Sequence, residues 1–295
     1  MNIIVTGGEG QLARCLKQTV ENNKTENNYY FFSKKDLDIT NEENIKNIFT
    51  QYNIEYVVNC AAYTNVDAAI NNIDKAYKIN KEGPYILSKI CKEYNTKLIH
   101  ISTDFVFSGT QNIPYKTKDY THPLSVYGHS KKAGESLLIP FDNVLIIRTS
   151  WLYSDFGKNF FNTMYDRVVN NLETFVVNDQ IGTPTYAMDL SEFIYNIIEY
   201  NEEFNTENKI LHYSNEGCCS WYDFAKTIEL IYNIKNNKTS NIIKPISTYD
   251  YEQMVNKILA LRPKYSVLSK DCLKDYNYAK NRHWIEALME CIDKK

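Results

Sequence analysis

The sequence predicts an α/β fold built on a doubly wound parallel sheet, with a smaller C-terminal lobe. Three features support this prediction: short apolar runs alternate with helical patterns, a glycine-rich turn follows the first run, and polar residues end several later ones. The alternation indicates parallel strands because each parallel pair needs a crossover connection, usually a helix. We expect the sheet domain at residues 1–150 and the lobe at 151–295, with about 185–213 returning to the first domain.

The first apolar run and the turn after it predict a phosphate site. Residues 3–5 are apolar, residues 7–10 read Gly-Gly-Glu-Gly, and apolar residues then recur at helical spacing from Leu12. Gly7 permits a tight turn, Gly10 lets backbone approach a pyrophosphate, and a helix N-terminus attracts its charge. With Ala13 at the third small position, this pattern is typical of Rossmann-type dinucleotide binding. The alternative is an ordinary turn between a strand and a helix.

The end of the second expected strand, residues 30–32, bears on the choice of cofactor. An NAD-specific site usually places an acid there, which binds the ribose 2′-hydroxyl. This chain instead has Ser33, Lys34 and Lys35, a hydroxyl and two cations that suit a 2′-phosphate. We therefore expect NADPH as the cofactor, with NADH also accepted. The alternative is a solvated loop, in which lysines are common.

The strand-helix alternation repeats up to residue 150 and continues less regularly beyond it. Strands are expected at 57–62, 98–101, 144–148, 174–177 and 210–213, and helices at 41–52, 74–94, 157–171, 188–200 and 221–232. The first of these strands runs into residues 63–67, which are small and polar, and the next two end in residues 102–104 and 149–151. Because the carboxyl ends of parallel strands meet at the edge where ligands bind, we expect these residues to line one crevice.

Tyr127 and Lys131 are four residues apart, so in a helix both project from one face. A phenol with a pKa of about 10 is a poor acid at neutral pH. We expect the Lys131 ammonium to favour the phenolate and bring the pKa of Tyr127 toward neutrality. Tyr127 could then protonate a carbonyl oxygen as a hydride arrives at the carbon. The alternative is an exposed helix that carries both residues by chance.

The composition of the 295-residue chain excludes several other classes of protein. A net charge of −3 and a pI near 6.0 give no reason to expect nucleic acid or an anionic membrane as a partner. Seven cysteines without a C-x-x-C pair indicate reduced thiols, and five histidines show no metal-ligand spacing. With no signal-peptide pattern and no run of about 20 apolar residues, we expect a cytoplasmic protein without a metal site.

The glycine loop, the strand end at Thr103 and the Tyr127/Lys131 pair together resemble the extended short-chain dehydrogenase/reductase superfamily. Its hydroxyl-tyrosine-lysine triad would fall on Thr103, Tyr127 and Lys131. Longer stretches resemble one family within it, the dTDP-4-dehydrorhamnose reductases. These stretches are 37–40, 59–67, 100–107, 123–135, 148–151, 178–185, 212–214, 220–221 and 262–263. They cover nearly the whole chain in the family's order.

The resemblance implies an NAD(P)H-dependent oxidoreductase that reduces the C4 ketone of dTDP-4-dehydro-L-rhamnose to dTDP-L-rhamnose. Thr103, Tyr127 and Lys131 would be catalytic, with the proton coming from Tyr127. The expected cofactor-binding residues are Gly7, Gly10, Gln11, Leu12, Ser33, Lys34, Asp38, Ile39, Ala61, Ala62, Tyr63, Thr64, Tyr127 and Lys131.

The substrate would be a small-molecule nucleotide sugar, held between the triad and a substrate-binding C-terminal lobe. Thr103 and Asp104 would meet it, Trp151 would pack against it, and the loop with Thr183 would form a rigid rim. Arg262 is the candidate for the diphosphate because a planar guanidinium binds phosphate oxygens in pairs.

Other readings of the same fold remain open. A dehydratase of this superfamily needs an acidic base after the Thr-Asp pair, and Phe105 at that position argues against dehydration. A reductase or epimerase of another nucleotide-linked 4-keto sugar is an alternative, as is a dinucleotide-binding regulatory subunit resembling that of methionine adenosyltransferase. Some relatives bridge a dimer through magnesium on an acid of the first helix. This chain has Arg14 and Cys15 there, so we expect a monomer or a homodimer without that metal.

Overall fold

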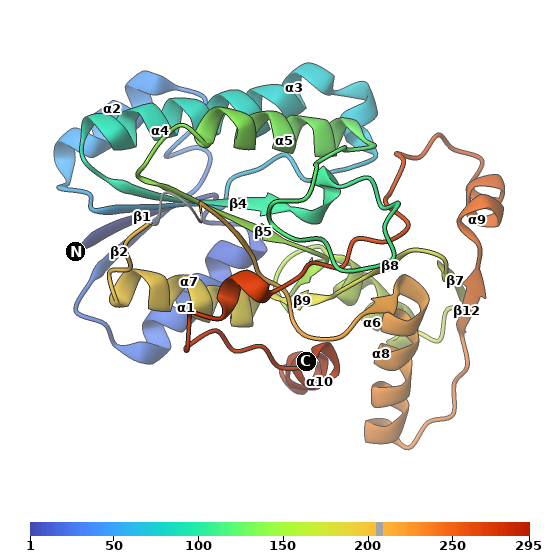
Figure 1. The fold of residues 1–295 in the computed structure, drawn as a ribbon. Helices are drawn as coiled ribbons and strands as arrows, with labels where there is room; N and C mark the ends of the chain where they lie inside the picture. Colours follow the sequence, from blue (N-terminus) through green and yellow to red (C-terminus); the bar gives the residue numbers. More distant parts are fainter. Residues whose placement is uncertain (205–208) are drawn as a thin grey trace.

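The computed structural model describes residues 1–204 and 209–295. Its centre is a six-stranded sheet, parallel throughout, in the order β10-β5-β4-β3-β1-β2 (Figure 1). The strands are β1 (Asn2–Thr6), β2 (Asn28–Phe32), β3 (Tyr56–Asn59), β4 (Lys97–Thr103), β5 (Val144–Thr149) and β10 (Ile210–His212). This arrangement confirms the predicted doubly wound parallel sheet.

The strand order reverses between β1 and β3. From β1 the chain moves to β2 at one edge, and it then returns to β3 and continues toward β10 at the other edge. Thr6 at the end of β1 lies in register with Asn59 at the end of β3. In open α/β sheets ligands bind at this topological switch point, beyond the carboxyl ends of the strands.

Helices cover both faces of the sheet (Figure 1). One face carries α1 (Gln11–Asn23) and α7 (Ala187–Glu199), and the other carries α2 (Glu42–Gln51), α4 (Gly83–Glu93) and α5 (Val126–Leu138). Side chains alternate between the faces along each strand. Ile3 and Val5 therefore belong to one buried cluster and Ile4 to the other.

The helical stretch expected at 74–94 is present and contains a π-helical turn. It consists of α3 (Ile73–Tyr77), the π turn η2 (Lys78–Glu82) and α4. Asn80, in the π turn, is 1% exposed. Single π turns inside helices frequently mark functional sites, and Asn80 is described again below.

The C-terminal part adds helices and short strand pairs to the sheet. Its longer elements are α6 (Phe160–Val169), β7 (Thr174–Val177), α8 (Trp221–Asn236), β12 (Ile243–Ile246), α9 (Thr248–Val255) and α10 (Trp284–Asp293). Two-residue strands are β6 (Leu152–Tyr153), β8 (Ile181–Gly182), β9 (Thr185–Tyr186) and β11 (Cys219–Ser220). The sequence predicted β7 but not its parallel partner β12, and α8 runs to Asn236, beyond the helix expected at 221–232.

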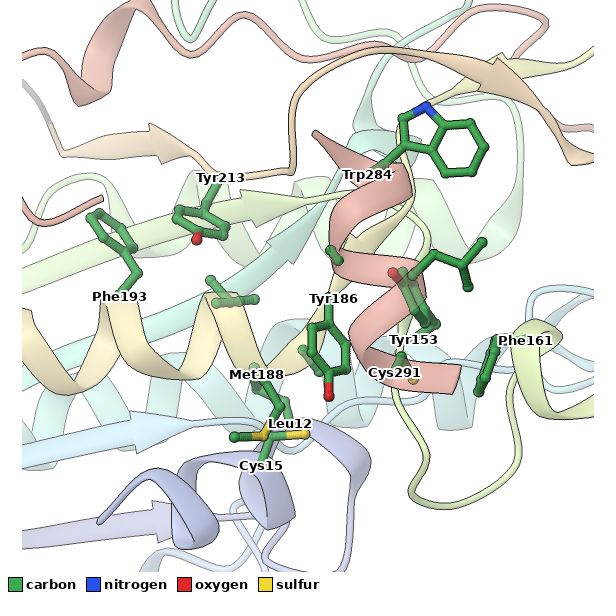
Figure 2. Packing of buried hydrophobic residues seen from close by; sticks show 14 of the residues in the cluster. Leu12, Cys15, Tyr153, Phe161, Tyr186, Met188, Phe193, Tyr213, Trp284 and Cys291 are labelled. Carbon is green, nitrogen blue, oxygen red and sulfur yellow. The ribbon is translucent and has the colours of Figure 1, made fainter. Parts of the chain in front are cut away.

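The C-terminal segments share the core of the sheet. Figure 2 shows Cys15 of α1, Met188 of α7 and Cys291 of α10 converging, with Tyr153 and Tyr186 beside them. Strand β10 pairs with β5, and α7 packs on α1. The division into domains at residue 150 stays a prediction. Within residues 1–204 and 209–295, no helix combines the length and apolar character that a membrane span needs.

Candidate active site

A cleft of about 1400 Å³ runs along the carboxyl edge of the central sheet. Its lining begins at the loop after β1 and includes the segments that follow β2, β3, β4 and β5. Tyr127 and Lys131 line it from α5. Residues of α6, α8, α9 and the segment 259–264 also line it, so the sheet and the C-terminal part both contribute to the cleft.

The loop after β1 forms a cradle that only glycine can make. Gly7 has φ +64°, and a β carbon there would lie 2.9 Å from the Ala61 nitrogen. A β carbon on Gly10 would lie 3.1 Å from the Gly7 carbonyl oxygen. Helix α1 starts at Gln11 and has no side-chain cap, so its first N–H groups are available to an anion. Gly7, Gly10, Gln11 and Leu12 all line the cleft, and the cradle fits a dinucleotide pyrophosphate.

The segment after β2 brings some of the predicted residues to the cleft. Lys34, Asp38 and Ile39 line it. The Lys34 ammonium lies 3.9 Å from an Asp38 carboxylate oxygen, and the Lys34 side chain is 71% exposed. Ser33 is not part of the lining, because its hydroxyl donates to Asp36 at 2.6 Å within its own turn.

The segment after β3 is held by Asn80, a residue that the sequence analysis missed. Ala61, Ala62 and Thr64 line the cleft, whereas Tyr63 does not. The Asn80 amide accepts from the Tyr63 nitrogen at 2.8 Å and donates to the Tyr63 carbonyl at 3.0 Å. The same amide lies 3.0 Å from the Ser130 hydroxyl of α5, so the π turn joins this segment to α5.

Thr103 and Tyr127 meet where β4 ends and α5 begins. Thr103 is the last residue of β4, and its hydroxyl accepts from the Phe105 nitrogen at 3.2 Å. Ser125 caps α5 by accepting from the Gly128 nitrogen at 3.2 Å, which places Tyr127 in the first turn. The rings of Phe105 and Tyr127 pack edge to face, 5.6 Å apart. Thr103, Phe105 and Tyr127 line the same part of the cleft.

Lys131 is buried beneath Tyr127, one turn further along α5, and its side-chain contacts differ from the sequence prediction. Its ammonium donates to the Ile101 carbonyl at 2.7 Å and lies 3.2 Å from Nε2 of His100. Burial lowers the pKa of Lys131 to about 8, and the charge of Glu135 opposes this effect.

The prediction that Lys131 brings the pKa of Tyr127 toward neutrality was wrong. Burial raises the pKa of Tyr127 to about 12; a hydrogen bond with Thr103 lowers it and the charge of Asp104 raises it. Desolvation of the phenolate therefore outweighs the attraction of a cation that is bound elsewhere. Tyr127 consequently remains protonated at neutral pH, which is the form that can donate a proton.

Asp104 is a buried carboxyl group on the cleft. It is 2% exposed, and burial raises its pKa to about 6, although groups on Ser266 and Thr103 oppose the rise. Its Oδ2 atom forms no well-aligned hydrogen bond with any residue in the described parts of the chain. An unsatisfied buried carboxylate beside a cleft is typical of a functional group that awaits a partner.

Trp151 and Trp221 form a flat aromatic wall of the cleft. Their rings stack 3.5 Å apart at 6°. Trp151, two residues after the end of β5, has φ +45°, a left-handed conformation that is rare outside glycine. Gly182 leaves room for the indole, because a β carbon there would lie 2.5 Å from it. The sequence analysis placed Trp221 at the start of a helix and in a stretch that resembles the family, but its pairing with Trp151 could not be foreseen from residues 70 positions apart.

Of the other two residues predicted to bind substrate, Arg262 reaches the cleft and Thr183 does not. Arg262 lines the cleft, and its guanidinium binds both oxygens of Asp67 at 3.1 and 2.9 Å. Thr183 is fully buried and does not line the cleft, and its hydroxyl donates to the Gly217 carbonyl at 2.8 Å. The structure therefore brings Arg262 to the site but not the Thr183 side chain. Three further cations line the cleft that the sequence analysis did not single out: Lys158, Arg167 and Lys264.

Comparison with known proteins agrees with the sequence resemblance. The family model described as the RmlD substrate binding domain matches residues 1–295. A dTDP-4-dehydrorhamnose reductase of Aggregatibacter actinomycetemcomitans is 38% identical over 271 residues, which cover 90% of each chain. The spore coat polysaccharide biosynthesis protein SpsK of Bacillus subtilis is 35% identical over 294 residues, 99% of this chain and 97% of that protein.

A solved structure extends the similarity to three dimensions. The dTDP-4-dehydrorhamnose reductase of Bacillus anthracis, determined in complex with NADP, has a TM-score of 0.88 and 34% identity, covering 100% of this chain and 99% of that one. A family model that matches the full length and relatives of this similarity lead to one conclusion: the chain belongs to the dTDP-4-dehydrorhamnose reductase family.

Proposed function

We propose that this protein reduces the C4 ketone of dTDP-4-dehydro-L-rhamnose to dTDP-L-rhamnose, with NADPH as the cofactor. It is an NAD(P)H-dependent oxidoreductase of the Rossmann type. The observation that carries the proposal is the position of Thr103, Tyr127 and Lys131 on one cleft that begins at a dinucleotide cradle. The B. anthracis relative, solved with NADP, supports the choice of cofactor.

The residues of this chain would supply the proton that the reduction needs. NADPH, when bound, supplies the hydride for the ketone carbon. The Tyr127 phenol donates its proton to the ketone oxygen, and the Thr103 hydroxyl holds that oxygen by a hydrogen bond. The resulting phenolate is stabilised by the positive charge of Lys131. Because the pKa of Tyr127 lies near 12, the donor form is the populated one at neutral pH.

Cofactor binding would use the first part of the cleft. The N–H groups of the first turn of α1, together with Gly7 and Gly10, would hold the pyrophosphate. Lys34 would attract the 2′-phosphate. Its ammonium is exposed, and the Asp38 carboxylate, its ion-pair partner, lies 3.9 Å away and so binds it loosely. Ala61, Ala62 and Thr64 would follow the cofactor toward the triad.

Substrate binding would use the side of the cleft formed with the C-terminal part. The Trp151/Trp221 wall offers a flat apolar face, and Arg262 and Lys264 offer positive charge for the diphosphate. Asp104, close to Tyr127, offers a carboxyl group to a sugar hydroxyl. For Arg262 to take a phosphate, the Asp67 carboxylate must share or release the guanidinium.

Two alternatives remain and can be separated by assay. A reductase or epimerase of another nucleotide-linked 4-keto sugar would use the same triad, because the C-terminal part of the cleft selects the substrate. A dinucleotide-binding regulatory subunit would bind the cofactor without consuming it. Phe105 beside Tyr127 offers no base for a dehydratase.

The test is oxidation of NADPH by the purified protein with dTDP-4-dehydro-L-rhamnose, compared with the UDP-linked analogue. We expect turnover with the dTDP sugar and weaker turnover with the UDP sugar. Turnover with the UDP sugar alone would assign the protein to another nucleotide sugar, and binding of NADPH without turnover would support the regulatory role. We also propose that the protein is cytoplasmic and that it is a monomer or a homodimer. Light scattering on the purified chain measures its oligomeric state.

A further inference from the structure

A chain of hydrogen-bonding groups runs from Lys131 into the interior of the sheet. Nζ of Lys131 lies 3.2 Å from Nε2 of His100, and Nδ1 of His100 lies 3.0 Å from Nδ2 of Asn59. Oδ1 of Asn59 lies 2.7 Å from the Thr6 hydroxyl and 3.2 Å from the Ala61 amide nitrogen. The four side chains are at most 2% exposed, so they must satisfy one another.

One direction of this chain satisfies the Ala61 amide, which can only donate, through the Asn59 amide oxygen. The Ala61 amide is a donor, so the amide oxygen of Asn59 faces it and the amide nitrogen donates to His100. Burial and the charge of Lys131 lower the pKa of His100 well below its ordinary value, so the ring is neutral. A neutral ring that accepts at Nδ1 carries its proton on Nε2. The N–H group at Nε2 then donates to Nζ of Lys131, and Nζ can accept this hydrogen bond only if Lys131 is a neutral amine.

A protonated Lys131 requires the opposite direction. An ammonium has no acceptor, so Nε2 of His100 must accept and Nδ1 must carry the proton. The Asn59 amide then turns over, with its oxygen toward His100 and its nitrogen toward Thr6. The Ala61 amide keeps an acceptor, because the Thr6 hydroxyl oxygen lies 3.3 Å from it. In this direction the amide nitrogen of Asn59 takes the position 3.2 Å from the Ala61 nitrogen, so Ala61 keeps only the Thr6 hydroxyl as its acceptor.

We propose that His100 and Asn59 are positioning residues for the reduction, and that their hydrogen bonds reverse direction when Lys131 gains or loses a proton. The proposal rests on the proposed function, in which the charge of Lys131 stabilises the Tyr127 phenolate. The chain ends at Thr6 and Ala61, which adjoin Gly7 in the dinucleotide cradle. The protonation of Lys131 is thereby coupled to the backbone that holds the cofactor.

Several neighbouring elements contribute charged or titratable groups near Lys131. Glu135 lies one turn along α5 and is bound by Arg148 of β5 at 2.7 Å. His100 faces Lys131 from β4, while Asp104, after β4, acts on Tyr127. The π turn meets α5 through Asn80, which is uncharged. His100 is therefore the group in direct contact whose tautomer can follow the proton on Lys131.

A second buried histidine provides a matched control. His212 of β10 is as buried as His100, and its Nδ1 lies 3.1 Å from the Tyr115 carbonyl, which can only accept. Its Nε2 lies 3.4 Å from the Arg148 guanidinium, which only donates. Because an arginine does not lose its proton in a protein, the tautomer of His212 is fixed.

The test is ¹⁵N NMR of the histidine ring nitrogens from about pH 6 to about pH 10, a range that spans the titration of a buried lysine. We expect His100 to stay neutral and to move its proton from Nδ1 to Nε2 as the pH rises, while His212 does not change. In Lys131→Met the tautomer of His100 should no longer depend on pH. A wild-type His100 with one tautomer throughout, or with an ordinary imidazolium titration, would overturn the proposal.

Kinetics supply a second readout. In His100→Gln the pH profile of kcat should shift by at least about half a pH unit, whereas His212→Gln should keep the wild-type profile. An unchanged profile in a folded His100→Gln protein would contradict the positioning role. If the wild-type protein shows no reductase activity, the proposed function fails, and the NMR measurement still decides whether the chain reverses.

Discussion

A β carbon on Gly128 would lie 2.3 Å from the carbonyl oxygen of Phe105, much closer than non-bonded atoms can approach. Helix α5 therefore reaches the segment after β4 only because residue 128 has no side chain. This approach places Tyr127 of α5 beside Thr103 of β4, the two residues that the proposed reaction needs at one ketone oxygen.

Gly128→Ala should lower kcat by at least about tenfold, because a displacement of about 1 Å at a reacting group can cost 10²-fold. Binding of NADPH to the cradle after β1 should change less. The matched control is Ser136→Ala, an exposed position of α5 whose hydroxyl bonds only within the helix. Wild-type turnover in Gly128→Ala would show that the close approach is not needed.

Asp104→Asn should stabilise the protein at pH 8 while lowering its turnover. Burial raises the pKa of Asp104 from 3.8 to about 6, so the folded state carries a penalty above pH 6 that disappears as the pH falls toward 3.8. At about 1.4 kcal/mol per pKa unit, the penalty is about 3 kcal/mol at most. Urea unfolding at pH 8 and pH 5 should show a larger gain at pH 8.

The control for Asp104→Asn is Asp142→Asn, at an exposed carboxylate beside Lys92. The Lys92 ammonium lowers the pKa of Asp142, so this substitution should give no gain in stability. If Asp104→Asn raised the free energy of unfolding equally at pH 8 and pH 5, burial of a charged Asp104 carboxylate would not be the source of the gain.

Lys34→Ala should raise the Michaelis constant for NADPH and leave that for NADH nearly unchanged. The reason is position: Lys34 lines the cleft, whereas Lys35 does not. Lys35→Ala is therefore the matched control and should alter neither constant. Equal effects of Lys34→Ala on both cofactors would assign the residue to a solvated turn rather than to a 2′-phosphate.

Arg262→Ala should weaken binding of free dTDP to the NADPH-loaded protein, measured by calorimetry. Asp67→Ala gives the discriminating comparison, since the Asp67 carboxylate binds both terminal nitrogens of the Arg262 guanidinium. If Arg262 binds the diphosphate, Asp67→Ala should retain or strengthen dTDP binding because it frees the guanidinium. If the pair is only a clamp between segments, both variants should lose affinity equally.

The strands and the cradle could be predicted because their signals are local. Residues 3–5 are apolar and meet a glycine turn at once, and a run of this kind reads as a buried strand from a few residues alone. The polar residues after β3, β4 and β5 could then be placed together, since parallel strands bring their carboxyl ends to one edge.

The remaining features depend on tertiary packing that no local pattern encodes. The Trp151/Trp221 stack and the burial of Thr183 depend on how distant segments meet. The pKa of Tyr127 depends on whether burial or a nearby cation dominates, and that balance follows from distances that the i, i+4 spacing does not fix. Asn80 was missed because a buried amide in a helix has no signature until its partners, Tyr63 and Ser130, are known.

The most direct measurement of the proposed chemistry is single-turnover reduction by Tyr127→Phe, which removes one oxygen and leaves the ring against Phe105. If Tyr127 is the proton donor, the rate with dTDP-4-dehydro-L-rhamnose should fall by at least the ~10²-fold typical of losing a general acid, with NADPH affinity nearly unchanged. A Tyr127→Phe protein that keeps most of the wild-type rate would contradict this assignment.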